Sequence, residues 1–297
     1  MLRPAPIQAG RAAINNADTC TMTWNATLNL RYARSAERTV AHHRHEGPLR
    51  VLKSLYPESP QVCHNVLVHP PGGIAGGDTL AVQVAVEAGA HGLVSTPGAT
   101  RFYRCDQGSG VQRVTVQLDE GARLEWLPLE TLVYPGARAE NFLTMELAPG
   151  AALIGWDVVG LGLPHAGQPF DRGQLLQRIE WPGHWLEQAR IDAADERLLS
   201  SPLGLAGRRC MATLFYASGN PVARAPREQA LELTRAQLAS HALAPSAGVT
   251  WLNDQLLVLR VLADVTEPAT ALLRQVWGTW RGHFWDMPAT PPRIWAV

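Results

Sequence analysis

Alternation of apolar and polar residues with a period of two dominates the first two thirds of the chain. This period is typical of β-strands that bury one face. The clearest segments are residues 26–33, 80–86, 111–118, 142–147 and 174–181. Proline and glycine, 22 and 26 in number, separate these segments at short intervals. The pattern therefore predicts a series of strands and disfavours long helices before residue 225.

A weak internal repeat runs through the same region. Three stretches each read as a strand, a turn ending in Gly-Ala and a second strand; they are VQVAVEAGAHGLVSTPGA, VTVQLDEGARLEWLPLE and LTMELAPGAALIGWDVV. The turn glycines are Gly89, Gly121 and Gly150, spaced 32 and 29 residues apart. Such a period predicts stacked β-layers, solenoid-like or sandwich-like, whose loops recur on one side.

The pattern changes after Pro226. Residues 227–243 combine spaced leucines with strong helix formers, and residues 267–285 form a second amphipathic segment with Thr266 as its expected N-cap. Between them, residues 251–262 predict a hairpin that turns at Asn-Asp. The expected fold is mainly β, a stacked, helix-like arrangement of strands with a small C-terminal α–ββ–α region.

This reading divides the chain into three parts. Residues 1–22 are expected to be a loose leader, residues 23–225 the stacked-strand region, and residues 226–297 an α–ββ–α cap that belongs to the same domain. A chain of 297 residues can bury a sizeable core in this arrangement.

Charge and composition narrow the function classes. Lys and Arg together number 26, as do Asp and Glu, so the net charge is zero and neither nucleic acid nor an anionic membrane is an expected partner. The N-terminus has no apolar signal-peptide core, and no apolar run reaches the roughly 18 residues of a membrane span. Four cysteines stand far apart with no CxxC pair. We therefore expect a reduced, cytoplasmic protein.

Common enzyme motifs are missing from the sequence. The single lysine, Lys53, has no glycine loop before it, so there is no P-loop, and neither G-x-S-x-G nor H-E-x-x-H occurs. A non-enzymatic protein is expected. The alternative from a different class is a cofactor-free hydrolase that uses Asp78 and Asp157 as paired acids.

Histidines in the segment HHRHE could contribute to a metal site. On a strand, His43 and His45 share a face and His42 points the other way. Two imidazoles on one face can begin a nickel or zinc site, but a solvated strand edge has the same pattern. A closed structural zinc site is not expected.

Carboxylates in apolar segments are a second candidate for chemistry. They are Asp78, Glu125, Glu130 and Asp157. A carboxylate is costly to bury alone and needs a cation, water or a hydrogen-bond network. Two interpretations stay open: structural salt bridges, with Arg101 and Arg104 as nearby partners, or a polar path through a β scaffold.

Five ordered segments of the chain resemble the UreD family (UreH in some organisms) of urease accessory proteins. They are HPPGGIAGGDTL, TPGATRFYR, LEWLPLETLVYPGA, WDVVGLGLPHAGQPFDRG and the C-terminal PPRIWAV. The resemblance runs from about Trp24 to the last residue. It implies a β-rich stack of strands with two C-terminal helices. It also implies a non-enzymatic scaffold that works with UreF and the GTPase UreG to insert nickel into the urease apoprotein.

The resemblance also implies where nickel would pass. The family is thought to carry it through an internal water-filled channel, associated with the positions of Asp78, Asp157 and Thr100. His69 would be a second contact or would bind the backbone of the glycine-rich turn. The residue pattern, rather than the resemblance, adds Arg101, Glu125 and Glu130 as residues that would line or support such a channel. No tightly bound cofactor is expected, only transient Ni²⁺.

Departures from the family pattern concern one loop. Where the family reads CLGRP-x-x-GE, this chain has Gly160, Leu163 and Gln168. A thiol and two charges are thereby lost. A further carboxylate position of the family can be matched here only by Glu187.

Tryptophans concentrate near the C-terminus. Trp277, Trp280, Trp285 and Trp295 fall within 19 residues. Because tryptophan is enriched in binding hot spots, one hypothesis makes the first three part of a partner-binding surface. The alternative is that they pack the cap on the strands.

Overall fold

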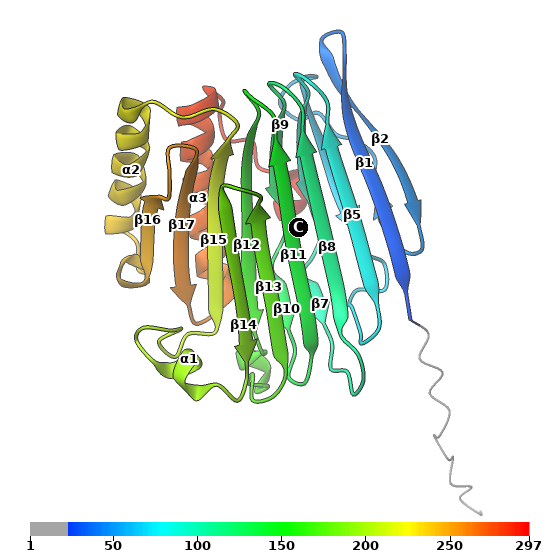
Figure 1. Cartoon of the computed structure of the whole chain (residues 1–297), viewed down its shortest axis with the longest axis vertical. Helices are drawn as coiled ribbons and strands as arrows, with labels where there is room; N and C mark the ends of the chain where they lie inside the picture. The colour runs from blue at the N-terminus through cyan, green and yellow to red at the C-terminus, as the bar shows by residue number, and fades with distance from the viewer. Residues whose placement is uncertain (1–22, 297) are drawn as a thin grey trace, which may run out of the picture.

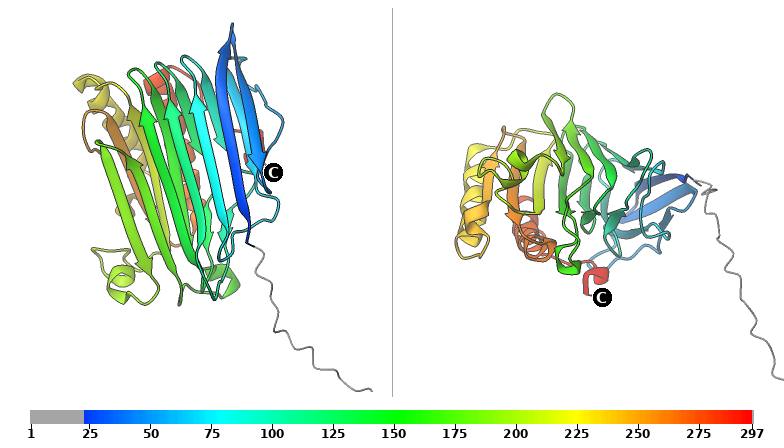
Figure 2. Two further views of the ribbon diagram at one scale, coloured as in Figure 1. Left: turned by 45° about the vertical axis from the view of Figure 1, so that its right-hand side comes forward. Right: turned by 90° about the horizontal axis from the view of Figure 1, so that it is seen from below.

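The computed structural model describes residues 23–296, which form two stacked β-sheets and a layer of helices (Figure 1). The expected leader, residues 1–22, lies outside the described residues. The two sheets lie face to face, and α2 and α3 cover one part of the second sheet (Figure 2). The predicted fold class, mainly β with stacked coils of strands, is confirmed.

The first sheet has seven strands in the order β14-β13-β11-β8-β5-β1-β2. From β5 to β13 neighbouring strands run parallel, and antiparallel hairpins close both edges. The bounds are β1 Asn25–Ser35, β2 Arg38–Glu46, β5 Thr79–Val86, β8 Gly110–Leu118, β11 Arg138–Leu147, β13 Gln174–Trp181 and β14 Trp185–Asp192. All five segments predicted from alternation belong to this sheet.

The second sheet has ten strands, and its main path is β16-β17-β15-β12-β9-β6-β4-β3. Short strands β7 and β10 pair beside β12. The bounds are β3 Arg50–Val51, β4 Val62–Val68, β6 His91–Ser95, β7 Thr100–Phe102, β9 Arg123–Leu127, β10 Thr131–Val133, β12 Ala152–Leu161, β15 Cys210–Ser218, β16 Ala247–Trp251 and β17 Leu256–Ala263.

The turn glycines of the repeat stack on one another at one end of the sheets. Gly89, Gly121 and Gly150 all have positive φ, between 65° and 73°, which favours glycine over every other residue. The amide of Gly89 donates to the Glu120 carbonyl of the next turn. Each coil therefore places its turn on that of the next, and the predicted stacking of repeated units is confirmed.

Side-chain alternation along each strand divides the interior into two cores. Within β12, Leu153 and Val159 face the inner core between the two sheets, whereas Ile154, Trp156 and Val158 face the outer core beneath the helices. A strand buried on both faces reads as a nearly continuous apolar run, as LIGWDVVGL does. The one charged residue in that run is therefore in an unusual place.

Within residues 23–296, helices are confined to the second half of the chain. α1 spans Glu196–Ser200, α2 Arg224–Ala239 and α3 Thr266–Trp285. Three 3₁₀ turns occur at Pro164–Ala166 (η1), Ala244–Ser246 (η2) and Arg293–Ala296 (η3).

Three details of the predicted cap are wrong. The first predicted helix ends four residues early, at Ala239 instead of residue 243. The first predicted helix begins three residues earlier, at Arg224, because Pro226 is tolerated in a first turn where its missing N–H costs nothing. In α3 the N-cap is Val265, without a side-chain cap, and Thr266 is already helical.

The predicted hairpin is confirmed as β16 and β17, joined by residues 252–255. It pairs with β15, so strands from both sides of residue 225 share one sheet. The division at residue 225 itself stays a prediction.

Candidate functional site

Three amide side chains form a polar row across the first sheet. Gln112 in β8, Asn141 in β11 and Gln177 in β13 are in register as direct neighbours. The residues two positions away along each strand, such as Val114 after Gln112, face the inner core, so these three side chains face it as well. The amide nitrogen of Gln112 donates to the Asn141 side-chain oxygen at 3.1 Å. Three polar side chains therefore lie side by side on the core-facing side of the first sheet, where apolar residues are expected.

Asp157 in β12 completes the polar row from the second sheet. The Asn141 amide donates to Asp157 Oδ1 at 3.1 Å, and the Gln177 amide donates to Oδ2. Asp157 is in register with Thr213 in β15, which is in register with Arg260 in β17. We define the polar row as Gln112, Asn141, Gln177, Asp157 and Thr213. It joins both sheets through the inner core.

The environment of Asp157 changes its acidity. The pKa of Asp157 is raised from 3.8 to about 6, mainly by burial; the nearby negative charge of Glu187 acts in the same direction, and the amides of Gln177 and Asn141 act in the opposite one. The carboxyl group is thus mainly ionised at pH 7 and mainly protonated at pH 5. Its negative charge, which would attract a cation, is therefore present at neutral pH and is lost as the pH falls.

One end of the polar row meets a cavity of about 220 Å³. Gln112 lines it together with His69, Thr100 and Arg101, so three of the predicted site residues converge there. His69 Nε2 is buried and has no hydrogen-bond partner among the described residues, which differs from the expected bond to the turn. Burial lowers the pKa of His69 although the charge of Asp78 opposes it, so the neutral imidazole is favoured. A neutral ring nitrogen without a partner is able to bind a metal ion.

The other end of the polar row reaches the edge where β14 faces β17. There Arg260 makes a two-pronged ion pair with Glu187, from Nη1 to Oε1 and from Nη2 to Oε2. The polar side chains thus extend from a cavity to a charged pair at the surface.

Asp78 holds the glycine-rich turn together. Its carboxylate oxygens accept the backbone amides of Trp24 and Ala75, each at 2.8 Å, and the residue is buried. The turn before β5 and the start of β1 are thereby fixed to each other. Among the described residues no hydrogen bond joins Asp78 to Asp157. The geometry gives Asp78 a structural task, and its contact with nickel stays a prediction.

Glu125 lies on the opposite face of the second sheet from Asp157. It is fully buried and accepts hydrogen bonds from His91 Nε2 at 2.9 Å, Arg281 Nε at 3.2 Å and Trp277 Nε1 at 2.6 Å. Arg281 also binds Glu58, which pairs with His64. These five ionisable residues, Glu58, His64, His91, Glu125 and Arg281, form what we call the buried ion network.

The buried ion network corrects one expectation. The sequence offered Arg101 and Arg104 as partners for the carboxylates, but Glu125 is bound by Arg281, 156 positions away. Arg101 lines the cavity at the polar row, and Arg104 pairs with Asp106 at the surface at 3.1 Å. Strand-to-helix pairs of this separation leave no local signal in the sequence.

Glu130 is separate from both groups. It lines another cavity, of about 210 Å³, with Gly160 and Thr266. A Cβ at Gly160 would approach Leu132 to 2.9 Å, so a side chain fits there only if its neighbours shift. Cys210 is the direct neighbour of Gly160 in register, but burial raises its pKa to about 12, so this thiol stays protonated.

Histidines of β2 have the geometry that the sequence predicted. His43 and His45 stack on one face of the strand with ring centroids 6.2 Å apart. Within residues 23–296 no group of three or more His, Cys, Asp or Glu side chains is placed to hold a metal ion. The metal interpretation of this pair therefore has no third ligand to support it.

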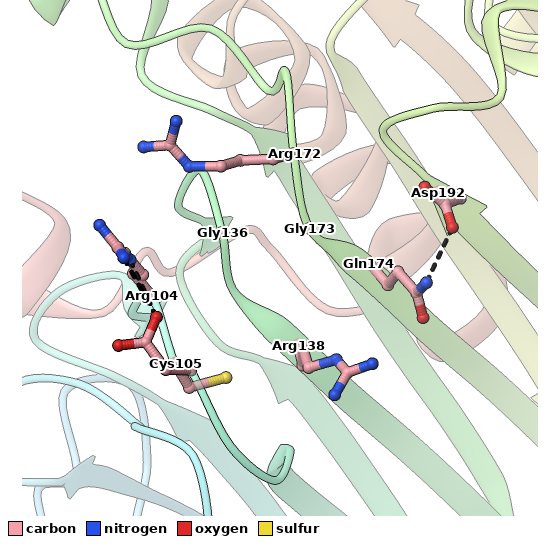
Figure 3. Close-up of a pocket in the computed structure, with 9 residues that line it drawn as sticks. Arg104, Cys105, Gly136, Arg138, Arg172, Gly173, Gln174 and Asp192 are labelled. Atoms are coloured by element: carbon pink, nitrogen blue, oxygen red, sulfur yellow. Dashed lines mark hydrogen bonds and ion pairs between the residues drawn. The ribbon is translucent and has the colours of Figure 1, made fainter.

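A pocket of about 560 Å³ lies where β11 and β13 begin and β14 ends, and no member of the polar row lines it (Figure 3). Arg104 and Arg172 flank Gly136, while Arg138 points away from them (Figure 3). Asp192 Oδ2 accepts a hydrogen bond from the Gln174 side-chain amide at 2.8 Å. Three guanidinium groups make this pocket unfavourable for a cation.

The C-terminal tryptophans are core residues, so the hypothesis that they form a partner-binding surface is corrected. Trp277, Trp280 and Trp285 are buried in the outer core. Their partners are internal: Trp277 donates to Glu125, and Trp280 donates to Thr234 Oγ1 at 2.8 Å. The alternative interpretation, packing of the cap on the strands, describes them.

Trp280→Phe should destabilise the protein by about 1–3 kcal/mol, because it removes the bond to Thr234 and leaves a small cavity. Urea unfolding measures this loss. The folded fraction should bind protein partners with unchanged affinity. Unchanged stability with weakened partner binding would restore the surface role.

Sequence reasoning missed most of the polar row. Asp157 was selected for its apolar surroundings, but Gln112, Asn141, Gln177 and Thr213 were not. A signal was present for the amides: each stands at the inward position of an alternating strand, as Gln177 does between Leu175 and Ile179. An Asn or Gln at an inward position of an alternating strand indicates a polar partner on the facing sheet.

Comparison with known proteins gives the family. The profile of the UreD urease accessory protein family matches residues 25–296. A urease accessory protein UreD of Variovorax paradoxus is 58% identical over 276 residues, covering 93% of this chain and all of the relative. Those of Polaromonas naphthalenivorans and Leptothrix cholodnii are 59% and 51% identical, with 93% and 92% of this chain covered and 100% and 99% of each relative. This chain therefore belongs to the UreD family of urease accessory proteins.

Proposed function

We propose that this protein is a non-enzymatic scaffold that delivers nickel to the urease apoprotein in the cytoplasm, in complex with UreF and UreG. Family membership supports a role in urease maturation, and the polar row supports a route for the metal. The observation that carries the proposal is Asp157, a carboxylate inside a β-sandwich whose hydrogen-bond donors are the Asn141 and Gln177 amides rather than Arg or Lys side chains. Nickel is the cargo, and no tightly bound cofactor is required.

The amides of the polar row suit a transported cation. In the structure all of them donate hydrogens toward Asp157, from Gln112 through Asn141 on one side and from Gln177 on the other. An amide that turns by 180° presents its oxygen instead of its nitrogen, at almost no change in shape. Asn141 and Gln177 could therefore release Asp157 and add oxygen ligands when Ni²⁺ arrives. One carboxylate with neutral oxygens binds weakly enough to let the ion leave.

The cavity beside Gln112 is the proposed entrance. His69 offers an unpartnered ring nitrogen, and Thr100 offers a hydroxyl. Arg101 in the same wall opposes free cations, which favours entry of nickel only when an anionic partner group accompanies it.

Within residues 23–296 no helix is long and apolar enough to cross a membrane.

Urease expressed with all accessory proteins except this chain tests the proposal. Nickel per urease active site, measured by atomic emission, should fall to a small fraction of the full set's value. A pull-down with UreF from the same cells tests the complex. Equal nickel content with and without this chain would contradict the proposal.

A further inference from the structure

Arg260 occupies an unexpected place at the surface end of the polar row. Asp157, Thr213 and Arg260 are consecutive neighbours across β12, β15 and β17. Strands are spaced about 4.8 Å apart, so the Arg260 backbone lies about 10 Å from that of Asp157. A guanidinium group therefore stands on the line that a cation leaving Asp157 in this direction would follow.

The Glu187–Arg260 pair joins the edges of the two sheets. Glu187 belongs to β14, the edge of the first sheet, and Arg260 to β17, next to the edge of the second. Strand β14 alternates so that Trp185 and Ile191 are buried, and Glu187 shares their face. The Glu187–Arg260 ion pair therefore connects the two sheets near the β14 end of the polar row.

The pair is exposed enough to open. The Arg260 side chain is 50% exposed and that of Glu187 25% exposed. Exposed ion pairs contribute little to stability, so breaking this one costs little. The buried ion network, by contrast, is held on all sides and cannot open in this way.

We propose that Arg260 is a removable counter-ion for Glu187 that closes the β14 end of the polar row. Without a cation, the guanidinium neutralises Glu187 and blocks the line to Asp157. When Ni²⁺ reaches this end, it takes over the Glu187 carboxylate, and Arg260 turns into solvent. This inference rests on the proposed function, because it assigns a regulator to the same route.

Binding of Ni²⁺ alone to the full chain, co-purified with UreF, tests the proposal by equilibrium dialysis at pH 7.5. Arg260→Gln should tighten binding by about tenfold, because a positive charge beside the ligand is removed. Glu187→Gln should weaken it about fivefold or more for the opposite reason. Arg260→Lys loses the two-pronged contact but keeps the positive charge, so Ni²⁺ binding should stay within about twofold of the parent.

A matched control exists in the neighbouring strand. Arg178 pairs with Glu180 in β13, and their side chains are 38% and 24% exposed, similar to those of Arg260 and Glu187. Both lie on the face of the strand opposite to that of Gln177. Arg178→Gln should leave Ni²⁺ binding unchanged, and a tenfold gain there would overturn the assignment to Arg260. Thermal unfolding of each variant shows whether it is folded.

Asp157→Asn distinguishes a failure of the counter-ion role of Arg260 from a failure of the nickel route itself. If it weakens Ni²⁺ binding while Arg260→Gln leaves binding unchanged, the counter-ion role is wrong and the nickel route stands. If neither variant alters binding, the route itself is wrong, and the counter-ion role with it.

Discussion

Asp157→Asn is expected to leave a folded, more stable protein that no longer supports nickel loading of urease. The substitution keeps the shape of the side chain and removes its charge. Its amide oxygen can still accept one hydrogen bond, and Gln177 can turn to receive the other. What is lost is the one carboxylate among the members of the polar row, and with it the attraction for Ni²⁺.

The stability gain follows from the acidity of Asp157. Its pKa is about 6 in the folded protein and near its ordinary 3.8 in the unfolded chain. Because the folded state binds the proton more tightly, the folded protein is favoured at low pH, and this advantage is lost as the pH rises from about 4 through 6. Above pH 7 ionised Asp157 costs roughly 1–3 kcal/mol. The residue keeps some contact with solvent, which favours the lower half of that range.

Thermal unfolding at pH 7.5 and pH 4 measures the effect. Asp157→Asn should raise the melting temperature by a few degrees at pH 7.5 and by little or nothing at pH 4. Nickel content of urease matured with the variant should fall about tenfold or more. Normal nickel content would contradict the route, and loss of soluble protein would assign Asp157 to the fold instead.

Asp78→Asn is the comparison that distinguishes a cation ligand from a turn residue. Both oxygens of Asp78 accept backbone amides, and an asparagine can accept only on its oxygen. The variant should therefore be less stable by about 1–2 kcal/mol, with the same loss at pH 6 and pH 8. Opposite signs for the two aspartates at pH 7.5 would distinguish their tasks.

Much of the fold could be predicted from the sequence because its repeated unit is local. The turns at Gly89, Gly121 and Gly150 require positive φ, and alternation marks the strands of the first sheet. The second sheet was harder, because strands such as β4 and β12 are buried on both faces and lose the alternation. Helix bounds moved by a few residues where Pro226 was taken as a boundary.

The candidate site could be predicted only in part. Asp157 could be selected because a charge within an apolar run needs a partner. Its actual partners come from other coils of the stack, so only the register of β8, β11 and β13 brings them together. The tryptophans show the reverse failure. Composition suggested a surface, but the second sheet and α2 supply enough apolar area to bury them.

Arg281→Met is expected to cause the largest loss of stability in the protein, about 3–5 kcal/mol. Arg281 is fully buried and is the permanent positive charge of the buried ion network, where it binds Glu125 and Glu58. Methionine fills a similar volume but leaves two carboxylates without their cation. Because α3 is attached to the second sheet through this contact, the helix should loosen from β6 and β9.

The dependence of this loss on pH identifies its cause. Burial alone would raise the pKa of Glu58, but the hydrogen bonds from His64 and Arg281 outweigh it and lower the pKa. In the parent protein this contribution to stability is present above the ordinary pKa of a glutamate and is lost as the pH falls through the lowered value. Without Arg281 the pKa of Glu58 should rise, so the variant should lose less stability than the parent on acidification toward pH 4.

Urea unfolding of Arg281→Met, Glu125→Gln and the double variant measures the coupling. The loss of stability in the double variant should be about 1–3 kcal/mol smaller than the sum of the two single losses. The reason is that Glu125→Gln removes a buried negative charge that Arg281→Met leaves without its positive partner. Arg274→Met in the same helix is the control: Arg274 is half-buried over the Trp295 ring, and its loss should cost about 1 kcal/mol. Equal costs for Arg274 and Arg281, or strict additivity with Glu125→Gln, would show that α3 is held by apolar packing and not by the buried ion network.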